Sequence, residues 1–324
     1  MNFYTYIFYT VGIVLLYSCD QKVSVKNTEL TAINQLSYTD VIYKSEEDTV
    51  LTASFDGKIK QIIRKDTAKR LIIDISDEIY GLAYNDDENL IYAATYKSGI
   101  LVINEKSSSI EKAIQLEEKW ANQITYDPQT KLLMTYDLGG NTYLLQTDKA
   151  YEPLSIPKKF EKMVPKSIIN GVIYFDGTGT AGLWKIKDNQ MKSDITLKGK
   201  IVAADQSGNI LSYSHDQFFF YHGEKDSLLF NNKHPNWPIY VSSLDSVVRV
   251  PKSLYLTTGI IGENHIFTSG IDRSIRKWKK SNGEFSEDLL GHKATISAMD
   301  ISESEKQLVS VDLRGGIRFW DLKE

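Results

Sequence analysis

The sequence predicts an all-β protein built from a repeated antiparallel meander. The C-terminal part shows the repeat most clearly, because three short apolar segments at 296–301, 307–311 and 316–320 are separated by polar turns. Short apolar runs bounded by turn residues are typical of β-strands. Nineteen tyrosines and twelve phenylalanines agree with this prediction, since aromatic side chains favour pleated, half-buried surfaces.

The second and third of these segments form a hairpin pattern, 308–320, in which Trp320 follows Ser310 by ten residues. Six similar patterns lie upstream, at 50–62, 90–103, 132–145, 172–184, 210–221 and 266–278. In the first of them, Asp56-Gly57 is a strong hairpin turn signal. Consecutive ends are 37 to 42 residues apart, except for one step of 57. Seven hairpins predict seven structural units, with six or eight as alternatives.

The unit that opens on Gly291-His292 and closes on Trp320-Asp321 resembles one repeat of the WD-repeat β-propeller family. The preceding hairpin, with Thr268 and Trp278, is similar to the same pattern. The resemblance implies an all-β, seven-bladed β-propeller of four-stranded antiparallel blades. It also implies a non-catalytic protein-binding scaffold more than an enzyme.

The two ends of the chain are expected to close the ring together. Only three residues follow Asp321, so the last blade has no outer strand of its own. Residues 26–33 are the candidate for that strand, ahead of a first inner strand near 38–43. Pairing of the N- and C-terminal strands would remove exposed sheet edges. The alternative is that residues 20–36 form a disordered tether. With closure, residues 26–324 form a single propeller domain.

The N-terminus carries a second resemblance. Residues 7–16 are mostly apolar, and Leu16 and Ser18 precede Cys19, the only cysteine. This pattern resembles the lipobox of bacterial lipoproteins. It implies a signal peptide at 1–18, lipidation of Cys19, a tether at 19–25, and a lipid-anchored protein at the cell envelope that faces the periplasm or exterior. A lone thiol cannot form an internal disulfide, which agrees with lipidation. An uncleaved signal anchor or a misassigned start codon is the alternative.

Charge, composition and motifs give no support for a nucleic-acid, metal or cofactor ligand. The 38 basic and 42 acidic residues give no support for a nucleic-acid partner. The five histidines show no metal-binding spacing, and no nucleophile motif or cofactor motif stands out. The glycine-rich run at 177–182 lacks a phosphate loop's following helix and is assigned to a tight turn. The alternative function is an extracytoplasmic propeller enzyme or a glycan- or ligand-binding protein that uses the central channel.

The family resemblance also implies a buried chain of Trp, Ser or Thr, His and Asp in a blade. His292, Ser310 and Trp320 match three members, but the Asp position, six residues before the Trp, holds Arg314. The other candidates are Thr268, Asp272 and Trp278, which lack a Gly-His, and Thr52 and Asp56 in the first hairpin, which ends on Ile62. We therefore expect that no blade has the complete chain.

Partner-binding residues are expected in the turns that join second and third strands, because these turns share one face with the loops leading into each blade. The candidates are Phe55, Tyr96, Lys97, His215, Arg273 and Arg314. Tyr and Arg are favoured at interfaces. Arg314 would point to solvent or to a partner, or would merely cap its turn. The long step adds Trp237, expected either in a lid packed on the ring or at an exposed recognition tip, with packing slightly favoured.

Overall fold

The computed structural model describes residues 37–45, 48–64, 69–177 and 179–322. These residues form strands and turns, with three single-turn 3-10 helices, Thr147–Lys149, Lys158–Phe160 and Ser242–Leu244, and no α-helix in these ranges. In the same ranges no helix has the length and apolarity needed to cross a membrane. Cys19 and the candidate closing strand at 26–33 lie outside the described residues.

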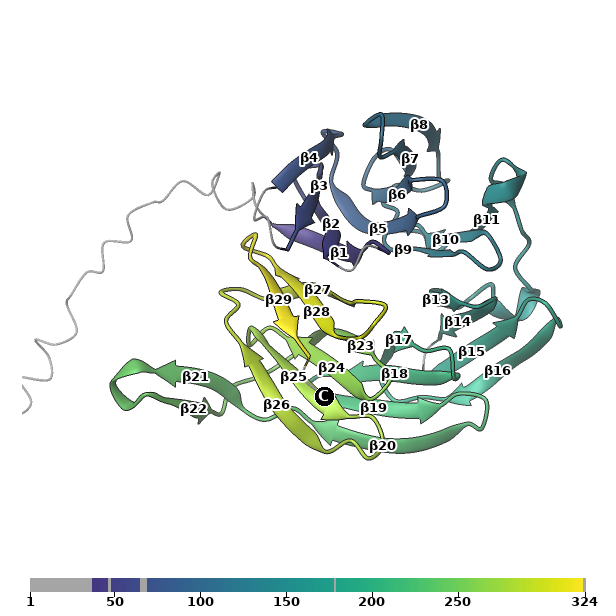
Figure 1. Cartoon of the computed structure of the whole chain (residues 1–324). Helices are drawn as coiled ribbons and strands as arrows, with labels where there is room; N and C mark the ends of the chain where they lie inside the picture. Colours follow the sequence, from purple (N-terminus) through teal and green to yellow (C-terminus); the bar gives the residue numbers. More distant parts are fainter. Residues whose placement is uncertain (1–36, 46–47, 65–68, 178, 323–324) are drawn as a thin grey trace, which may run out of the picture. The chain divides into compact units, whose positions relative to one another are not determined.

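The strands form seven antiparallel blades and one separate hairpin (Figure 1), so the prediction of a seven-bladed propeller is confirmed. The blades are β1 (Tyr38–Tyr43), β2 (Thr49–Ser54), β3 (Lys58–Ile63) and β4 (Lys69–Asp74); β5 (Ile79–Asn85), β6 (Leu90–Thr95), β7 (Ile100–Asn104) and β8 (Ser109–Ile114); β9 (Ile124–Asp127), β10 (Leu132–Tyr136), β11 (Thr142–Gln146) and β12 (Glu152–Pro153); β13 (Val164–Ile169), β14 (Val172–Asp176), β15 (Thr180–Lys185) and β16 (Gln190–Thr196); β17 (Lys200–Ala204), β18 (Asn209–Ser214), β19 (Gln217–His222) and β20 (Ser227–Lys233); β23 (Leu256–Ile261), β24 (His265–Gly270), β25 (Ser274–Lys279) and β26 (Phe285–Leu290); and β27 (Ile296–Ile301), β28 (Gln307–Asp312) and β29 (Ile317–Asp321). The separate hairpin is β21 (Trp237–Val241) with β22 (Ser246–Val250).

The seven predicted hairpins are the second and third strands of the seven blades. Their register agrees with the predicted ends: Val50 faces Ile62 in the first blade, and Leu308 faces Trp320 in the last. The second strands are buried almost throughout, as in β2 and β6. Both faces of these strands are therefore covered by neighbouring blades, which explains their continuous apolar sequence.

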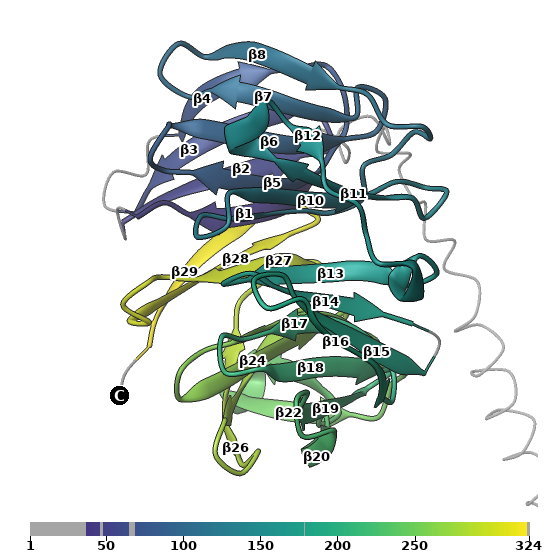
Figure 2. The ribbon, with the colours of Figure 1, turned by 90° about the vertical axis from the view of Figure 1, so that its right-hand side faces the viewer.

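The first strands of neighbouring blades pack against one another and close a ring (Figure 1). Figure 2 shows β1 of the first blade beside β27 and β28 of the last. The order around the ring is β1, β5, β9, β13, β17, β23, β27 and back to β1. Between the last and first blades, a buried cluster joins Val41 and Val50 to Val309 and Val311. The described residues therefore already bury apolar surface at the junction where the ends of the propeller meet.

Six of the seven first strands carry a β-bulge at the same place, near the strand's beginning. A bulge leaves one residue out of the ladder and turns its side chain away from the regular pleat. The extra residues are Thr39, Tyr80, Lys166, Val202, Thr257 and Ser297, and all of them line a central cavity of about 1000 Å³. The bulges therefore decide which side chains face the centre of the ring.

Polar side chains of the first strands also join neighbouring blades. The Tyr43 backbone N–H donates to Asp300 Oδ2 at 2.6 Å, and the Leu82 N–H donates to Asp40 Oδ2 at 2.8 Å. The Ser297 hydroxyl donates to the Tyr38 carbonyl at 2.7 Å. These bonds link the last blade to the first and the first to the second. Burial raises the pKa of Asp40 to about 7 and that of Asp300 to about 6.

We expect these two carboxyl groups to make the propeller less stable as the pH rises. A carboxyl group whose pKa is higher in the folded state binds its proton more tightly there, so stability falls between the ordinary value near 3.8 and the folded value. Asp300 is already half ionised at pH 6, so Asp40 contributes the larger part of the slope between pH 6 and 7. Asp40→Asn should flatten the pH dependence of the urea unfolding free energy in that interval. Asp188→Asn, at an exposed position, should leave it unchanged. Equal slopes in the wild type and Asp40→Asn would contradict this role.

Candidate functional site

One face of the propeller carries the predicted binding turns. Each blade runs from its first strand to its fourth with alternating direction, so the turns between second and third strands lie at the same end as the loops that lead to first strands. Backbone bonds join the two sets: Phe55 N–H to Ser37 O at 3.1 Å, and Leu256 N–H to His215 O at 2.9 Å. We call this end of the ring the turn face.

Four aromatic side chains from the first, second and third blades meet on the turn face. The Phe55 and Tyr80 rings lie edge to face with centroids 5.4 Å apart. The Trp120 ring lies 5.0 Å from Tyr80 and 6.5 Å from Tyr96. All four side chains are half-buried. Leu138 lies next to them, because its N–H donates to the carbonyl of Lys119, and its side chain is 62% exposed. We call Phe55, Tyr80, Tyr96 and Trp120 the aromatic patch.

The loop and turn that support the patch are fixed in unusual ways. Trp120 has a backbone φ of 69°, a left-handed conformation that is uncommon for an aromatic residue. Its indole N–H is buried and has no hydrogen-bond partner among the described residues. The buried Asp77 carboxylate accepts from the N–H groups of Lys97 and Ser98, at 3.0 and 2.9 Å. Strain and an unpaired donor of this kind recur at functional positions.

Two of the four residues of the aromatic patch were predicted from the sequence. Phe55 and Tyr96 were candidates because they lie in turns between second and third strands. Tyr80 and Trp120 were missed because they lie just before or at the start of a first strand, outside the hairpin pattern used to find repeats. A signal for Trp120 did exist: it stands in the polar loop 117–123, where an isolated tryptophan has no strand to pack in.

The remaining candidates are on the turn face but do not join the patch. The exposed His215 ring lies 5.5 Å from Tyr255, which is itself 50% exposed. Arg273 is exposed and donates to the Lys293 carbonyl at 3.5 Å. The Lys97 and Arg314 side chains are also exposed. The patch therefore occupies the first three blades, while the cationic candidates are distributed around the ring.

The insertion forms the separate hairpin β21–β22 between the fifth and sixth blades. Trp237 lies at its base, opposite Val250; its indole N–H donates to the Ser253 carbonyl at 3.0 Å, and the Lys252 ammonium lies 4.3 Å from its ring centre. The hairpin does not form the expected lid on the ring: it projects outward (Figure 1) and contacts strand β26 of the sixth blade through Arg249, which pairs with Asp288. The alternative of Trp237 at the tip was wrong as well, since the tip holds Leu244, 65% exposed.

The last blade contains a complete buried chain, so the expectation that no blade has one was wrong. The Trp320 indole N–H donates to Ser310 Oγ at 2.8 Å, Ser310 Oγ lies 2.7 Å from His292 Nε2, and His292 Nδ1 lies 2.9 Å from Asp312 Oδ2. Burial lowers the pKa of His292, although Asp312 opposes this change, which favours a neutral ring. A neutral ring accepts from Ser310 and donates to Asp312, which satisfies every member.

Asp312 supplies the acid that was sought at position 314. Residues two apart on a strand point to the same side, so Asp312 lies on the same side as Ser310 and reaches His292. The same carboxylate accepts from the N–H groups of Arg314 and Gly316, at 2.9 and 2.8 Å. Asp312 thus replaces the missing acid and also holds the turn, which leaves the Arg314 side chain in solvent.

The sixth blade also has its histidine, which the sequence did not assign. Trp278 Nε1 donates to Thr268 Oγ1 at 2.7 Å, and Thr268 Oγ1 contacts His234 Nε2. The fully buried Arg276 lies between His234 and Asp272. Its Nη1 is 3.0 Å from His234 Nδ1, and its Nη2 is 2.7 Å from Asp272 Oδ2. His234 was missed because the inserted hairpin separates it from the first strand of its blade.

In the first blade, Thr52 and Asp56 do not form a shared network. The Thr52 hydroxyl donates to the Lys60 carbonyl at 3.3 Å, whereas Asp56 accepts from Ser54 and from the Lys58 ammonium, the latter at 2.7 Å. With Ile62 in place of a tryptophan there is no indole N–H to satisfy, so this blade depends on apolar packing.

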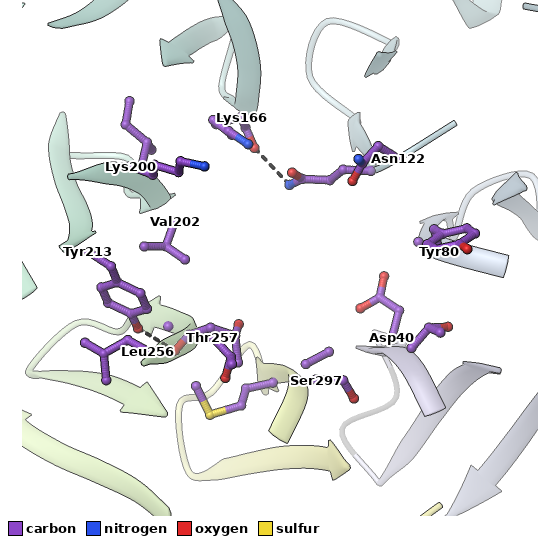
Figure 3. Close-up of a pocket in the computed structure, with 18 of the residues that line it drawn as sticks. Asp40, Tyr80, Asn122, Lys166, Lys200, Val202, Tyr213, Leu256, Thr257 and Ser297 are labelled. Atoms are coloured by element: carbon purple, nitrogen blue, oxygen red, sulfur yellow. Dashed lines mark hydrogen bonds between the residues drawn. The ribbon is translucent and has the colours of Figure 1, made fainter. Parts of the chain in front are cut away.

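The central cavity has charged groups on opposite walls. Figure 3 shows Lys166 and Lys200 on one side of the opening, with Asp40 and Tyr80 on the other. Within the described ranges, no three His, Cys, Asp or Glu side chains are grouped closely enough to hold a metal ion.

The fold is a seven-bladed β-propeller, and one blade of it matches a known repeat family. The family profile described as "WD domain, G-beta repeat" matches residues 283–321. Two solved structures share the fold: "Structure of U3-55K", at 16% identity and TM-score 0.70, covering 90% of this chain and 93% of that chain, and "Crystal structure of RRP9 WD40 repeats", at 15% identity and TM-score 0.69, covering 90% and 92%. No curated protein matches the sequence.

The last blade allows a direct comparison of the observed acid with the expected position. His292→Ala or Asp312→Ala should lower the free energy of unfolding by about 1–3 kcal/mol, because each leaves buried polar groups without partners. Arg314→Ala should change it by no more than about 0.5 kcal/mol, because that side chain is exposed. Urea denaturation measures all three. A large loss for Arg314→Ala with none for Asp312→Ala would reverse the assignment.

Proposed function

We propose that this propeller is a non-catalytic scaffold that binds a protein partner through the aromatic patch on its turn face. The patch carries this proposal. Aromatic side chains bury a large area at little conformational cost and dominate the energy of many interfaces. In this chain four of them, from three blades, lie together with the exposed Leu138 beside them.

The surroundings of the patch are suited to an interface rim. Lys97 and Lys119 are exposed, as are Glu78, Glu117 and Glu118. Charges of both signs around an apolar centre resemble the polar rim of protein interfaces, where they direct orientation more than affinity. The backbone beneath is fixed by Asp77 and by the bond from Trp120 N–H to Tyr96 O at 2.8 Å, so little ordering would be required on binding.

We further propose that the scaffold is held at the bacterial cell envelope by a lipid on Cys19. The apolar run at 7–16 and the Leu16 and Ser18 positions before the only cysteine support this proposal. Between Cys19 and the first described residue, Ser37, the chain reaches at most roughly 60 Å when extended, at about 3.3 Å per residue. A partner would then be a protein of, or near, the same membrane.

Removal of the central aromatic ring should weaken partner binding. Crosslinked envelopes identify the partner by affinity purification, and titration then compares variants. We expect Trp120→Ala to weaken binding by at least about tenfold, because it removes the ring that contacts both Tyr80 and Tyr96. The matched control is Ile110→Ala, a 47% exposed side chain on the outer strand β8 of the second blade. Equal affinities for Trp120→Ala and the control would exclude the patch as the interface.

The envelope anchor has its own test. Cys19→Ala should move the protein from the membrane fraction to the soluble fraction and abolish labelling with a fatty-acid analogue. Ser18→Ala, which keeps a small residue before the cysteine, should leave both unchanged. If fractionation and labelling of Cys19→Ala match the wild type, the lipoprotein proposal is wrong, while binding through the aromatic patch is unaffected by that result.

A further inference from the structure

Two lysines of the central cavity lack carboxylate partners. Lys166 is the bulge residue of β13, and Lys200 begins the neighbouring strand β17. Within the described part of the chain, no carboxylate oxygen lies within 4.0 Å of either ammonium group, whereas several other lysines of the propeller have such a partner. Figure 3 shows both side chains on the same wall of the opening.

The groups nearest these ammonium ions do not neutralise them. The Lys166 ammonium lies 3.5 Å from the Tyr136 hydroxyl and 5.3 Å from the centre of its ring. Asp176 interacts electrostatically with both lysines, and burial raises the pKa of its carboxyl group. Burial likewise lowers the pKa of Lys166 below its usual range. The two cations thus share one acid, and for the partly buried Lys166 a charge without a direct partner is costly.

The acids of the opposite wall are already engaged. Asp40 accepts from the N–H groups of Val41 and Leu82, both at 2.8 Å. Asp300 accepts from Ile301 and Tyr43, at 2.9 and 2.6 Å. These carboxyl groups link neighbouring blades. Figure 3 shows Asp40 across the cavity from the two lysines. The basic wall is therefore left open to a molecule that enters the cavity.

We infer that the central cavity binds a small anion whose carboxylate or phosphate group lies between Lys166 and Lys200. The cavity volume of about 1000 Å³ is at the upper end of those of ligand-binding pockets. A lysine ammonium attracts phosphate and carboxylate as a point charge and accepts varied geometry. This site differs from the aromatic patch in position and chemistry, so either can fail without the other.

Thermal unfolding with inorganic phosphate and with citrate tests the site. Both salts stabilise proteins without specific binding, so the informative quantity is the difference between variants at equal ionic strength. The test variant is Lys166→Gln/Lys200→Gln. The control is Lys187→Gln/Lys225→Gln, which removes the same charge from exposed turns of the same two blades. We expect at least one salt to raise the midpoint of the wild type and control about 2–4 °C more than that of the test variant, with saturation.

Equal increases in all three proteins with both salts, or no saturable increase in the wild type, would overturn the proposal. If the double variant does not fold, Lys200→Gln alone serves, because Lys200 is exposed and its loss does not disturb packing. A second measurement follows the Lys166 amine by NMR after ¹³C-methylation of lysines. Added phosphate or citrate should raise its pKa in the wild type, since an anion favours the charged form. No change with either probe also contradicts the site.

Discussion

Closure of the ring between the last and first blades is the constraint on which the rest of the structure depends. A blade is a sheet with two apolar faces, and only neighbouring blades on both sides can cover them. At the junction, Val41 and Val50 pack against Val309 and Val311, while Asp300 and Ser297 bond to the backbone of β1. Without this contact the first strands would not surround a cavity, and the turns of separate blades would not share a face. The aromatic patch and the pair of lysines in the central cavity, Lys166 and Lys200, both depend on the closed ring.

Buried aspartates fix the backbone of turns on the turn face. Asp312 and Asp77 each accept backbone N–H groups of a turn, and each holds that turn from below. These bonds fix the backbone of each turn. The side chains of Arg314 and Lys97 are exposed in the same turns, and they take no part in the bonds that fix them. The structure thus separates residues that shape the turn from residues that are available to a partner.

The sequence was sufficient for the blades because hairpin periodicity follows from local strand and turn preferences, and all seven hairpins lie where the pattern put them. It was insufficient wherever a contact crosses between elements. Asp312 was missed because the search followed one family position and not the side of the strand that faces His292. His234 was missed because an insertion separates it from its blade. The bulges that turn residues such as Lys166 and Tyr80 inward depend on strand pairing, which a linear pattern does not contain.

The central claim is that the turn face is the face that engages a partner. Crosslinking mass spectrometry on intact envelopes tests this claim directly, because the crosslinked peptides themselves identify the partner. Lys97 and Lys119 are exposed on the turn face beside the patch, whereas Lys187 and Lys225 are exposed in turns at the opposite end of the strands. The account predicts that crosslinks to one other protein concentrate at Lys97 and Lys119. Crosslinks that concentrate at Lys187 and Lys225, or an absence of any reproducible crosslinked protein, would contradict it.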